Sequence, residues 1–304
     1  MTADIDIAIC TFRRSHIVDT IESVGQILPP EGLSIRIIVV DNDDTPSAKD
    51  KVIACRVPFP VTYLHASGRN ISIARNACID AATAPILVFI DDDELVAQDW
   101  LINLVSEQQR SGADVVLGPA KAIYNDNAPK WMQKRDHHSS SATYVDGEIR
   151  SGYGCNTLLM QSAPPVAGLR FRLDLGRSGG EDTVFISSIH QRGGKISYAS
   201  DALVTEAVPP ARAKLMWLLR RKFRFGQTHG LMLKEGLLGK RVRPLRDVPV
   251  VIGKALCCFG MMILTAPLID KSAAWLLRGT LHAGVAYELL GGKSLEIYGT
   301  DQPI

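Results

Sequence analysis

The sequence predicts an α/β protein in which a mostly parallel sheet is flanked by helices and followed by an apolar, helical C-terminal segment. Two observations support this prediction. In residues 1–120, short apolar runs alternate with stretches of helical periodicity, which is typical of parallel sheets with right-handed crossovers. After residue 205, the apolar runs lengthen to stretches of helical length, and basic residues cluster between them.

Five short apolar runs are expected to form the strands of the sheet. They are residues 5–10, 33–40, 61–65, 86–90 and 114–117. Helices are expected between them: one capped by Ser15 and ending before Pro29, a short one after Asp44, one over residues 72–82, and one beginning at Trp100. Strands connected in this way lie parallel and present their carboxyl ends at one edge of the sheet.

The expected strand at residues 86–90 is continuously apolar, as in strands buried on both faces. It is followed directly by four acidic residues, Asp91, Asp92, Asp93 and Glu94. Open α/β sheets bind their ligands at this edge. Because four adjacent carboxylates repel one another, a divalent cation (Mg²⁺ or Mn²⁺) completed by substrate phosphates would hold them together. The alternative is a solvated turn whose acids cap a helix over residues 95–110.

The middle of the chain is less regular. Residues 124–150 are polar and are expected to form a loop-rich insertion near the site edge. Residues 154–160 are expected to form a further strand, and residues 181–191 a helix with acids in its first turn.

Charge is nearly balanced over the whole chain, with 34 Lys and Arg against 32 Asp and Glu, so the sequence gives no support for a nucleic-acid partner. The basic residues nevertheless gather between positions 212 and 246. Such a local cluster indicates an anionic partner, either a phosphate group or a membrane surface.

The six cysteines show no CxxC spacing, which favours a reducing compartment over a disulfide framework. The first residues lack the basic and apolar regions of a secretory signal. The active face is therefore expected on the cytoplasmic side.

Two apolar stretches follow the basic cluster. Residues 248–269 contain Lys254 as their only charge before Asp270, and residues 273–290 are interrupted by Arg278. The first stretch is long enough to span a bilayer, although Lys254 and Pro249 weaken that interpretation. A hairpin lying on a membrane surface and a buried helical pair of a soluble subdomain are the alternatives, and all three stay open.

Polar signatures follow each of the first four expected strands. Thr11 and Arg13 follow the first and Asp41 the second, while Arg75 and Asn76 lie in the helix after the third. The acidic cluster follows the fourth. Each signature alone has a common structural explanation as a cap, a turn or a surface charge. Four of them at one sheet edge form a joint pattern that loop chemistry does not require.

The order of these motifs resembles that of family 2 glycosyltransferases of the GT-A fold. The motifs read Cys-Thr-Phe-Arg-Arg, Val-Asp-Asn, Gly-Arg-Asn…Ala-Arg-Asn-Ala and Asp-Asp-Asp-Glu. Bacterial enzymes that build exopolysaccharides such as succinoglycan show the strongest resemblance, which covers about residues 4–230. The resemblance implies a Rossmann-like sheet, a nucleotide-sugar donor that is most often UDP-linked, and a saccharide or lipid-linked saccharide acceptor.

The resemblance also implies roles for the donor side of the site. Thr11 and Arg13 would lie near the nucleotide, and Asp41 would meet the base. Arg75 and Asn76 would approach the ribose and the diphosphate.

The acidic cluster contains the family's Asp-x-Asp element, Asp91 and Asp93. In the family the last Asp is the usual metal ligand, and Asp91 would lie close to the sugar or ribose. Glu206 stands where many members carry a metal-binding His, so it is a candidate third ligand. A metal that bridges the diphosphate oxygens stabilises their charge as the glycosidic bond breaks.

Inverting sugar transfer requires a base for the acceptor hydroxyl. Glu181 and Asp182 match the family's Glu-Asp element at a helix start, with Asp182 as the expected base and Glu181 as a positioning group. The alternative is that both are first-turn acids favoured by the helix dipole.

The basic helix expected at residues 214–224 supplies two further candidates. Arg221 and Arg224, three residues apart, share a helix face and are expected to hold the departing diphosphate or a lipid diphosphate acceptor. An amphipathic helix resting on the membrane is the alternative, and the two roles are compatible.

We therefore predict an inverting glycosyltransferase on the cytoplasmic face of the cell membrane. Residues 1–205 would form the catalytic domain, with nucleotide-sugar binding in about 1–120 and the acceptor part in 121–205, and residues 206–304 the membrane-associated segment. A sugar-nucleotide nucleotidyltransferase is one rival, but the Gly-rich loop that it needs after the first strand is missing from residues 10–14. A non-catalytic membrane-bound subunit is the other, and the intact acidic motifs argue against it.

Overall fold

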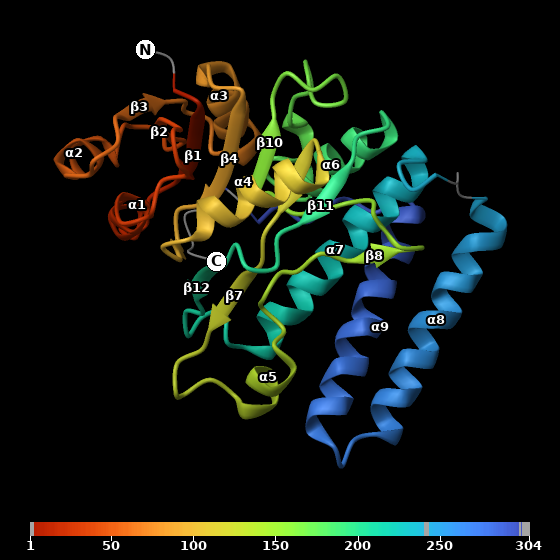
Figure 1. The fold of residues 1–304 in the computed structure, drawn as a ribbon. Helices are drawn as coiled ribbons and strands as arrows, with labels where there is room; N and C mark the ends of the chain where they lie inside the picture. Colours follow the sequence, from red (N-terminus) through yellow and green to blue (C-terminus); the bar gives the residue numbers. More distant parts are fainter. Residues whose placement is uncertain (1–2, 240–242, 298, 300–304) are drawn as a thin grey trace.

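The computed structural model describes residues 3–239, 243–297 and 299. In this part of the chain, a central sheet with helices packed on it forms an α/β domain, and long C-terminal helices lie beside that domain (Figure 1). The predicted fold class is confirmed.

The described residues form a seven-stranded sheet in the order β11-β6-β10-β4-β1-β2-β3. Its strands are β1 (Ile5–Thr11), β2 (Ile35–Asp41), β3 (Val61–His65), β4 (Ile86–Asp91), β6 (Val115–Leu117), β10 (Thr157–Met160) and β11 (Ile196–Tyr198). Only β10 runs antiparallel to its described neighbours β4 and β6. In the register of the sheet, Thr11 pairs with Asp41 and Cys10 with Asp91, so the polar signatures lie at one edge.

The strands are apolar on both faces because helices cover both sides of the sheet. In β1, Ile5, Ile7 and Ile9 pack into one core, whereas Ala8 and Cys10 pack into the other. This alternation explains why the predicted strands are mainly apolar, as is usual for buried parallel strands. The buried Asp6 of β1 is an exception, and Arg36 of β2 pairs with it at 2.7 Å.

The flanking helices lie close to their expected positions. They are α1 (Ile17–Gly25), α2 (Lys49–Ala54), α3 (Ile71–Ala81), α4 (Trp100–Ser111) and α6 (Glu181–Gln191). The predicted cap at Ser15 is wrong: His16 occupies the N-cap position of α1, and no side-chain cap bond is described there. In contrast, the side chain of Asn70 caps α3 by accepting bonds from the N–H groups of Ser72 and Ile73.

A second, three-stranded sheet was not predicted. Its order is β5-β12-β7, and its strands are β5 (Glu94–Val96), β12 (Val204–Ala207) and β7 (Ala120–Ile123). Because β5 follows the acids directly and α4 begins only at Trp100, the alternative of acids capping a helix over residues 95–110 is wrong. The predicted domain boundary after residue 205 falls inside β12.

The polar insertion at residues 124–150 is largely irregular, as expected. It contains the short helix α5 (Lys130–Arg135) and the two-residue strands β8 (Tyr144–Val145) and β9 (Glu148–Ile149). A 3₁₀ turn at Leu173–Leu175 precedes α6.

Three long helices follow the sheets: α7 (Leu215–Glu235), α8 (Pro244–Leu264) and α9 (Ile269–Leu289). Helix α9 lies between the other two, and the α8–α9 hairpin extends away from the sheet (Figure 1). Helices α7 and α9 touch through their backbones, because a Cβ atom on Gly226 would lie 2.0 Å from the carbonyl oxygen of Leu281 and one on Gly284 would lie 2.1 Å from that of Phe223.

Within the described residues, one helical segment, Arg246–Leu264 in α8, is long and apolar enough to cross a membrane by length and composition. Only 17% of its most apolar stretch is buried. Its exposed side chains include Leu256, Ile263 and Leu264. Helix α8 is thus unlike the core helix of a soluble protein, which is mostly buried.

Candidate active site

The acidic cluster lies in the tight turn that joins β4 to β5, at the carboxyl edge of the main sheet. Asp92 and Glu94 are buried, whereas Asp91 and Asp93 are half-buried. The Glu94 carboxylate accepts a bond of 2.9 Å from the Asp91 N–H, which closes the turn. Asp91 and Asp93 are therefore the two acids of the cluster that face the site opening.

Two arginines neutralise part of this charge. Arg14 lies 3.5 Å from Asp92 and also contacts Asp93, while Arg212 lies 3.5 Å from Asp93 and contacts Glu206. Thr11 Oγ1 donates a bond of 2.7 Å to Asp92, so its hydroxyl is engaged within the protein.

The acids outnumber the arginines, and their pKa values reflect this. Burial and the neighbouring Asp93 raise the pKa of Asp92 to about 7 against the opposing effect of Arg14. Burial and Asp91 raise the pKa of Glu94 well above its ordinary value. Burial, together with Asp93, raises the pKa of Glu206 to about 7. The cluster therefore favours a further cation.

The residues present fit a hard divalent cation. Carboxylate oxygens are the ligands that Mg²⁺ and Mn²⁺ prefer, and ligand atoms of Asp91, Glu94 and Cys155 lie within 4.8 Å of one another. Burial raises the pKa of the Cys155 thiol well above its ordinary value, so it is protonated and a poor ligand for such a cation. In the register of the second sheet Glu206 pairs with Glu94, which places the candidate third ligand beside the cluster.

Arg75 connects this cluster to the Glu-Asp pair. Its Nη1 donates to Glu181 Oε1 at 2.6 Å, and its Nη2 lies 3.4 Å from Asp91 Oδ1. Phe171 packs against the guanidinium at 5.5 Å. Two acidic motifs about ninety residues apart in the sequence thus share one buried arginine.

Glu181 is buried in the first turn of α6. Burial raises its pKa to about 7, Asp182 contributes to the rise, and Arg75 opposes it. Asp182, the next residue, is half-buried, and its two carboxylate oxygens accept bonds from the N–H groups of Gly154 (2.8 Å) and Thr183 (2.7 Å). These bonds fix the direction in which the Asp182 carboxylate points.

Gly154 lies between the two motifs. A Cβ atom at this position would come within 2.4 Å of Arg75 Nη1, so only glycine allows the backbone to approach both Arg75 and Asp182.

The predicted donor-side residues form a second network. The Asp41 carboxylate is fully buried and accepts bonds from the N–H groups of Asp43 and Ala48 and from Tyr63 Oη at 2.9 Å. Arg13, with a left-handed φ of 55°, donates to Asp43 at 2.8 Å. The two bonds of Asn76 both go to the main chain of Phe171 (2.9 and 2.8 Å), so Asn76 fixes the residue that packs on Arg75.

Arg221 and Arg224 lie on α7. The Arg221 guanidinium lies 5.2 Å from both the Trp217 and the Phe225 ring. Arg224 is buried, and among the described residues its Nε has no hydrogen-bond partner. It lines a cavity of about 10 Å³ together with Ser178, roughly the room that one water molecule needs.

The sequence model of the family described as "Glycosyl transferase family 2" matches residues 6–164, more than half of the chain. The chain belongs to glycosyl transferase family 2. It is a glycosyltransferase with the GT-A fold, as the motif order predicts.

Relatives of this glycosyltransferase support the assignment. The succinoglycan biosynthesis protein ExoM of Rhizobium meliloti (strain 1021) is 44% identical over 98% of this chain and 96% of its own length. The glucosyl-dolichyl phosphate glucuronosyltransferase of Haloferax volcanii is 23% identical over 75% of this chain and 77% of its own length.

Solved glycosyltransferases share the fold. The mannosyltransferase PcManGT from Pyrobaculum calidifontis, in complex with GDP-Man and Mn²⁺, has a TM-score of 0.63 at 16% identity and covers 96% of this chain and 88% of its own. S. aureus TarS 1–349 in complex with UDP-GlcNAc has a TM-score of 0.52 at 14% identity, with 96% and 93% covered. At these identities the similarity shows the fold alone.

Several residues of this glycosyltransferase site had no role in the sequence prediction. Arg14 belongs to the Cys-Thr-Phe-Arg-Arg motif and Arg212 to the basic cluster, and both turn out to contact the acids. Tyr63, which bonds Asp41, occupies an ordinary position in a strand. The basic cluster was the one signal that pointed to Arg212.

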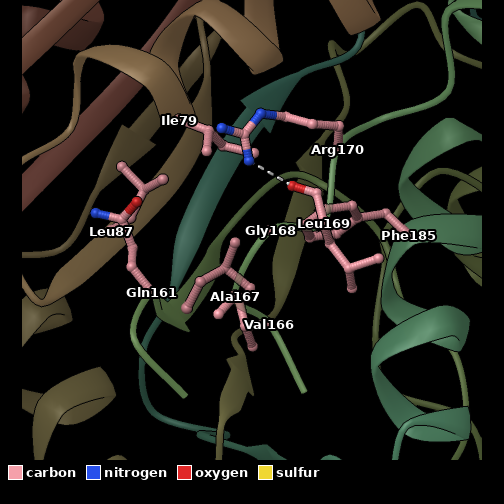
Figure 2. Close-up of a pocket in the computed structure, with 10 residues that line it drawn as sticks. Ile79, Leu87, Gln161, Val166, Ala167, Gly168, Leu169, Arg170 and Phe185 are labelled. Atoms are coloured by element: carbon pink, nitrogen blue, oxygen red, sulfur yellow. Dashed lines mark hydrogen bonds between the residues drawn. The ribbon is translucent and has the colours of Figure 1, made fainter. Parts of the chain in front are cut away.

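A cavity of about 190 Å³ in the glycosyltransferase is separate from this site (Figure 2). Its walls come from Ile79, Leu87, Leu159, Phe185 and the loop of residues 166–170. Phe185 stacks on Phe171 with ring centroids 4.1 Å apart, so one aromatic layer separates the cavity from Arg75. None of the predicted site residues lines it.

Proposed function

We propose that the protein is an inverting glycosyltransferase that moves a sugar from a UDP-sugar to a saccharide or lipid-linked saccharide in exopolysaccharide synthesis. The observation that carries the proposal is the bridge formed by Arg75 between Asp91 and Glu181, since it joins a diphosphate-side motif to a proton-accepting motif in one site. The similarity to the succinoglycan protein ExoM supports the pathway class, and the TarS complex with UDP-GlcNAc is consistent with a UDP-sugar donor.

In this proposal Asp182 is the base. The acceptor oxygen attacks the anomeric carbon, the bond from that carbon to the diphosphate oxygen breaks, and the acceptor proton passes to Asp182. The N–H bonds from Gly154 and Thr183 support this role because they hold the carboxylate in one orientation. Glu181 has a positioning role in this proposal, and Arg75 holds Glu181 in place.

Asp93, Asp91 and Glu206 are the proposed metal ligands. A bound Mg²⁺ or Mn²⁺ would supply charge stabilisation for the leaving diphosphate. The raised pKa values of Asp92 and Glu94 and the neighbouring position of Glu206 support a cation there, and PcManGT, a structural neighbour, was solved with Mn²⁺.

The donor-side residues act in two ways in this proposal. Arg75, Arg221 and Arg224 supply positive charge to the diphosphate. Thr11, Arg13, Asp41 and Asn76 form the wall of the nucleotide pocket, and their bonds within the protein give that wall its shape.

The α8–α9 hairpin is proposed to lie on the cytoplasmic face of the cell membrane. The exposed apolar surface of α8 and its low burial support this location over a buried helical pair. A surface hairpin also tolerates the exposed Lys254, whose amine reaches the headgroup region.

A donor screen tests the proposal. Thermal unfolding is followed with UDP-, GDP- and dTDP-sugars in the presence and absence of Mn²⁺. One UDP-sugar is expected to raise the melting temperature only when Mn²⁺ is present, and that donor is then tested for transfer to lipid extracts of the membrane. Release of pyrophosphate from a nucleoside triphosphate and a sugar phosphate would instead favour the nucleotidyltransferase.

Asp182→Asn tests the base. The amide cannot accept the acceptor proton, and its one oxygen keeps only one of the two N–H bonds. We therefore expect sugar transfer to fall by about 10³-fold or more while nucleotide affinity stays near wild type. Transfer is measured with radiolabelled donor, and UDP binding by calorimetry. Near-normal turnover would show that another group removes the proton.

A further inference from the structure

Two guanidinium groups enclose the carboxylate of Asp93. Arg14 contacts it from the segment after β1, and Arg212 Nη2 lies 3.5 Å from its Oδ2, reaching over from the loop between β12 and α7. The side chains of Arg212 and Asp93 are each 14% exposed, so the contact is shielded from solvent and weakly screened by salt.

Arg212 also contacts Glu206. Its Nη1 donates to Glu206 Oε1, so its fork bridges a carboxylate of β12 and one of the β4–β5 turn. The Arg212 guanidinium lies 5.9 Å from the Trp217 ring. The main-chain carbonyl oxygen of Arg212 lies 3.1 Å from His138 Nε2. Burial lowers the pKa of His138 to about 4, so the ring is neutral; Nε2 donates to that carbonyl and Nδ1 accepts from Tyr124. The main chain at Arg212 is thus anchored while its side chain bridges two acids.

Arg212 therefore binds two of the three acids that are proposed as metal ligands, Asp93 and Glu206. A guanidinium and a divalent cation carry charge of the same sign and compete for the same oxygens. A cation that binds these carboxylates repels the Arg212 guanidinium and weakens its bonds to them. A displaced guanidinium then needs another anion, and a diphosphate suits its planar fork.

We propose that Arg212 exchanges partners during donor binding: it holds Asp93 and Glu206 while metal and nucleotide are absent, yields them to the cation, and then binds the diphosphate. This inference rests on the metal-dependent transfer proposed above. It makes metal and nucleotide binding cooperative, because the metal alone displaces Arg212 without giving it a new partner.

Arg212→Met tests the exchange, since it removes the charge and keeps much of the apolar side-chain length. Mn²⁺ is titrated into the full-length protein, and free Mn²⁺ is measured by electron paramagnetic resonance with and without UDP. We expect the variant to bind Mn²⁺ alone about tenfold more tightly than wild type and Mn²⁺ with UDP about tenfold more weakly. A merely structural role of Arg212 would weaken both affinities.

Two further variants complete the test. Lys214→Met removes one positive charge from the same loop at an exposed position and is expected to match wild type in both titrations. Arg212→Lys keeps the charge but cannot bridge both acids. Its Mn²⁺ affinities, with and without UDP, are expected to lie between those of wild type and Arg212→Met. If circular dichroism shows that Arg212→Met is unfolded, Arg212→Lys is compared with wild type instead.

The proposed exchange would be overturned if folded Arg212→Met or Arg212→Lys bound Mn²⁺ alone as tightly as wild type does, or more weakly. Wild-type protein that binds no Mn²⁺, with or without UDP, would instead overturn the metal site itself, and the exchange with it.

Discussion

Asp92 illustrates how burial controls a single side chain of the site. It lies beneath the Asp-x-Asp pair, where Thr11 donates to one carboxylate oxygen and Arg14 lies 3.5 Å from the other. Burial and Asp93 raise its pKa from 3.8 to about 7. The folded protein therefore binds this proton more tightly than the unfolded chain, and the contribution of Asp92 to stability falls as pH rises from about 4 to 7.

Asp92→Asn removes this titration while keeping a partner for Thr11. We expect the stability of the variant relative to wild type to increase between pH 4 and pH 7 and to level off above pH 7, because only wild type must then keep the buried charge. Urea unfolding of metal-free protein at several pH values measures the difference. A difference that stays constant with pH would show that Asp92 keeps an ordinary pKa.

For single residues, the sequence indicates which residue types lie at the site but not which side chains contact one another. The carboxylates of Asp91 and Asp93 could be predicted because they end a continuously apolar strand. The bridge from Arg75 to Glu181 could not, because it depends on Gly154 letting the backbone pass within contact of Arg75. The roles of the individual site residues stay predictions.

Among the elements, α7 and α9 are joined by unusually close backbone contact. Gly226 faces the Leu281 carbonyl, and Gly284 faces that of Phe223. Helix α7 also packs on the start of α6, because a Cβ atom on Gly180 would meet the side chain of Thr228 at 2.4 Å. The α7–α9 crossing thus supports the start of α6.

Gly226→Ala is expected to destabilise the protein by about 1–3 kcal/mol, since the added methyl has no room and forces α7 and α9 apart. Gly260→Ala in α8 is the matched control: nothing lies within 4 Å of its Cβ position, so the higher helix propensity of alanine is expected to stabilise by up to about 1 kcal/mol. Chemical unfolding measures both. Equal effects of the two substitutions would contradict the close crossing.

The predictability of elements follows their burial. Six strands of the main sheet could be predicted because burial on two faces requires mostly apolar residues, as in β1 and β4. The seventh, the three-residue strand β11, was not predicted. Strands β5, β7 and β12 contain only three or four residues and include Glu94, Lys121 and Glu206, so no periodicity marks them. They form by pairing with each other, which is a non-local event.

For the molecule as a whole, the α8–α9 hairpin extends away from the sheet (Figure 1), and the membrane location proposed above would give the protein a fixed orientation. The apolar residues near its tip include Ile263, Leu264, Leu268 and Ile269, all exposed. Asp270, just beyond the tip, pairs with Lys134 and Arg135 of α5, which ties the hairpin to the insertion. The sequence alone left three arrangements of this segment open because hydropathy does not show which face is covered.

Leu264→Glu is expected to lower the partition of the protein onto anionic vesicles by about thirtyfold, since about 2 kcal/mol of side-chain transfer energy is lost. Leu264 is 76% exposed, so the fold tolerates the change. Leu28→Glu, at a 55% exposed position outside the hairpin, is the control and is expected to sediment with vesicles as wild type does. Vesicle binding that is unaffected by Leu264→Glu would place the contact elsewhere.

Trp217 stacks on His138 with ring centroids 5.1 Å apart and lies beside the guanidinium groups of Arg212 and Arg221. Indole fluorescence is sensitive to such neighbours, so the emission of Trp217 is expected to change when the loop that leads into α7 changes its conformation. A variant that retains Trp217 as its single tryptophan would let stopped-flow fluorescence follow donor capture in real time. The order in which cation and nucleotide arrive then becomes a kinetic observable that needs no attached dye.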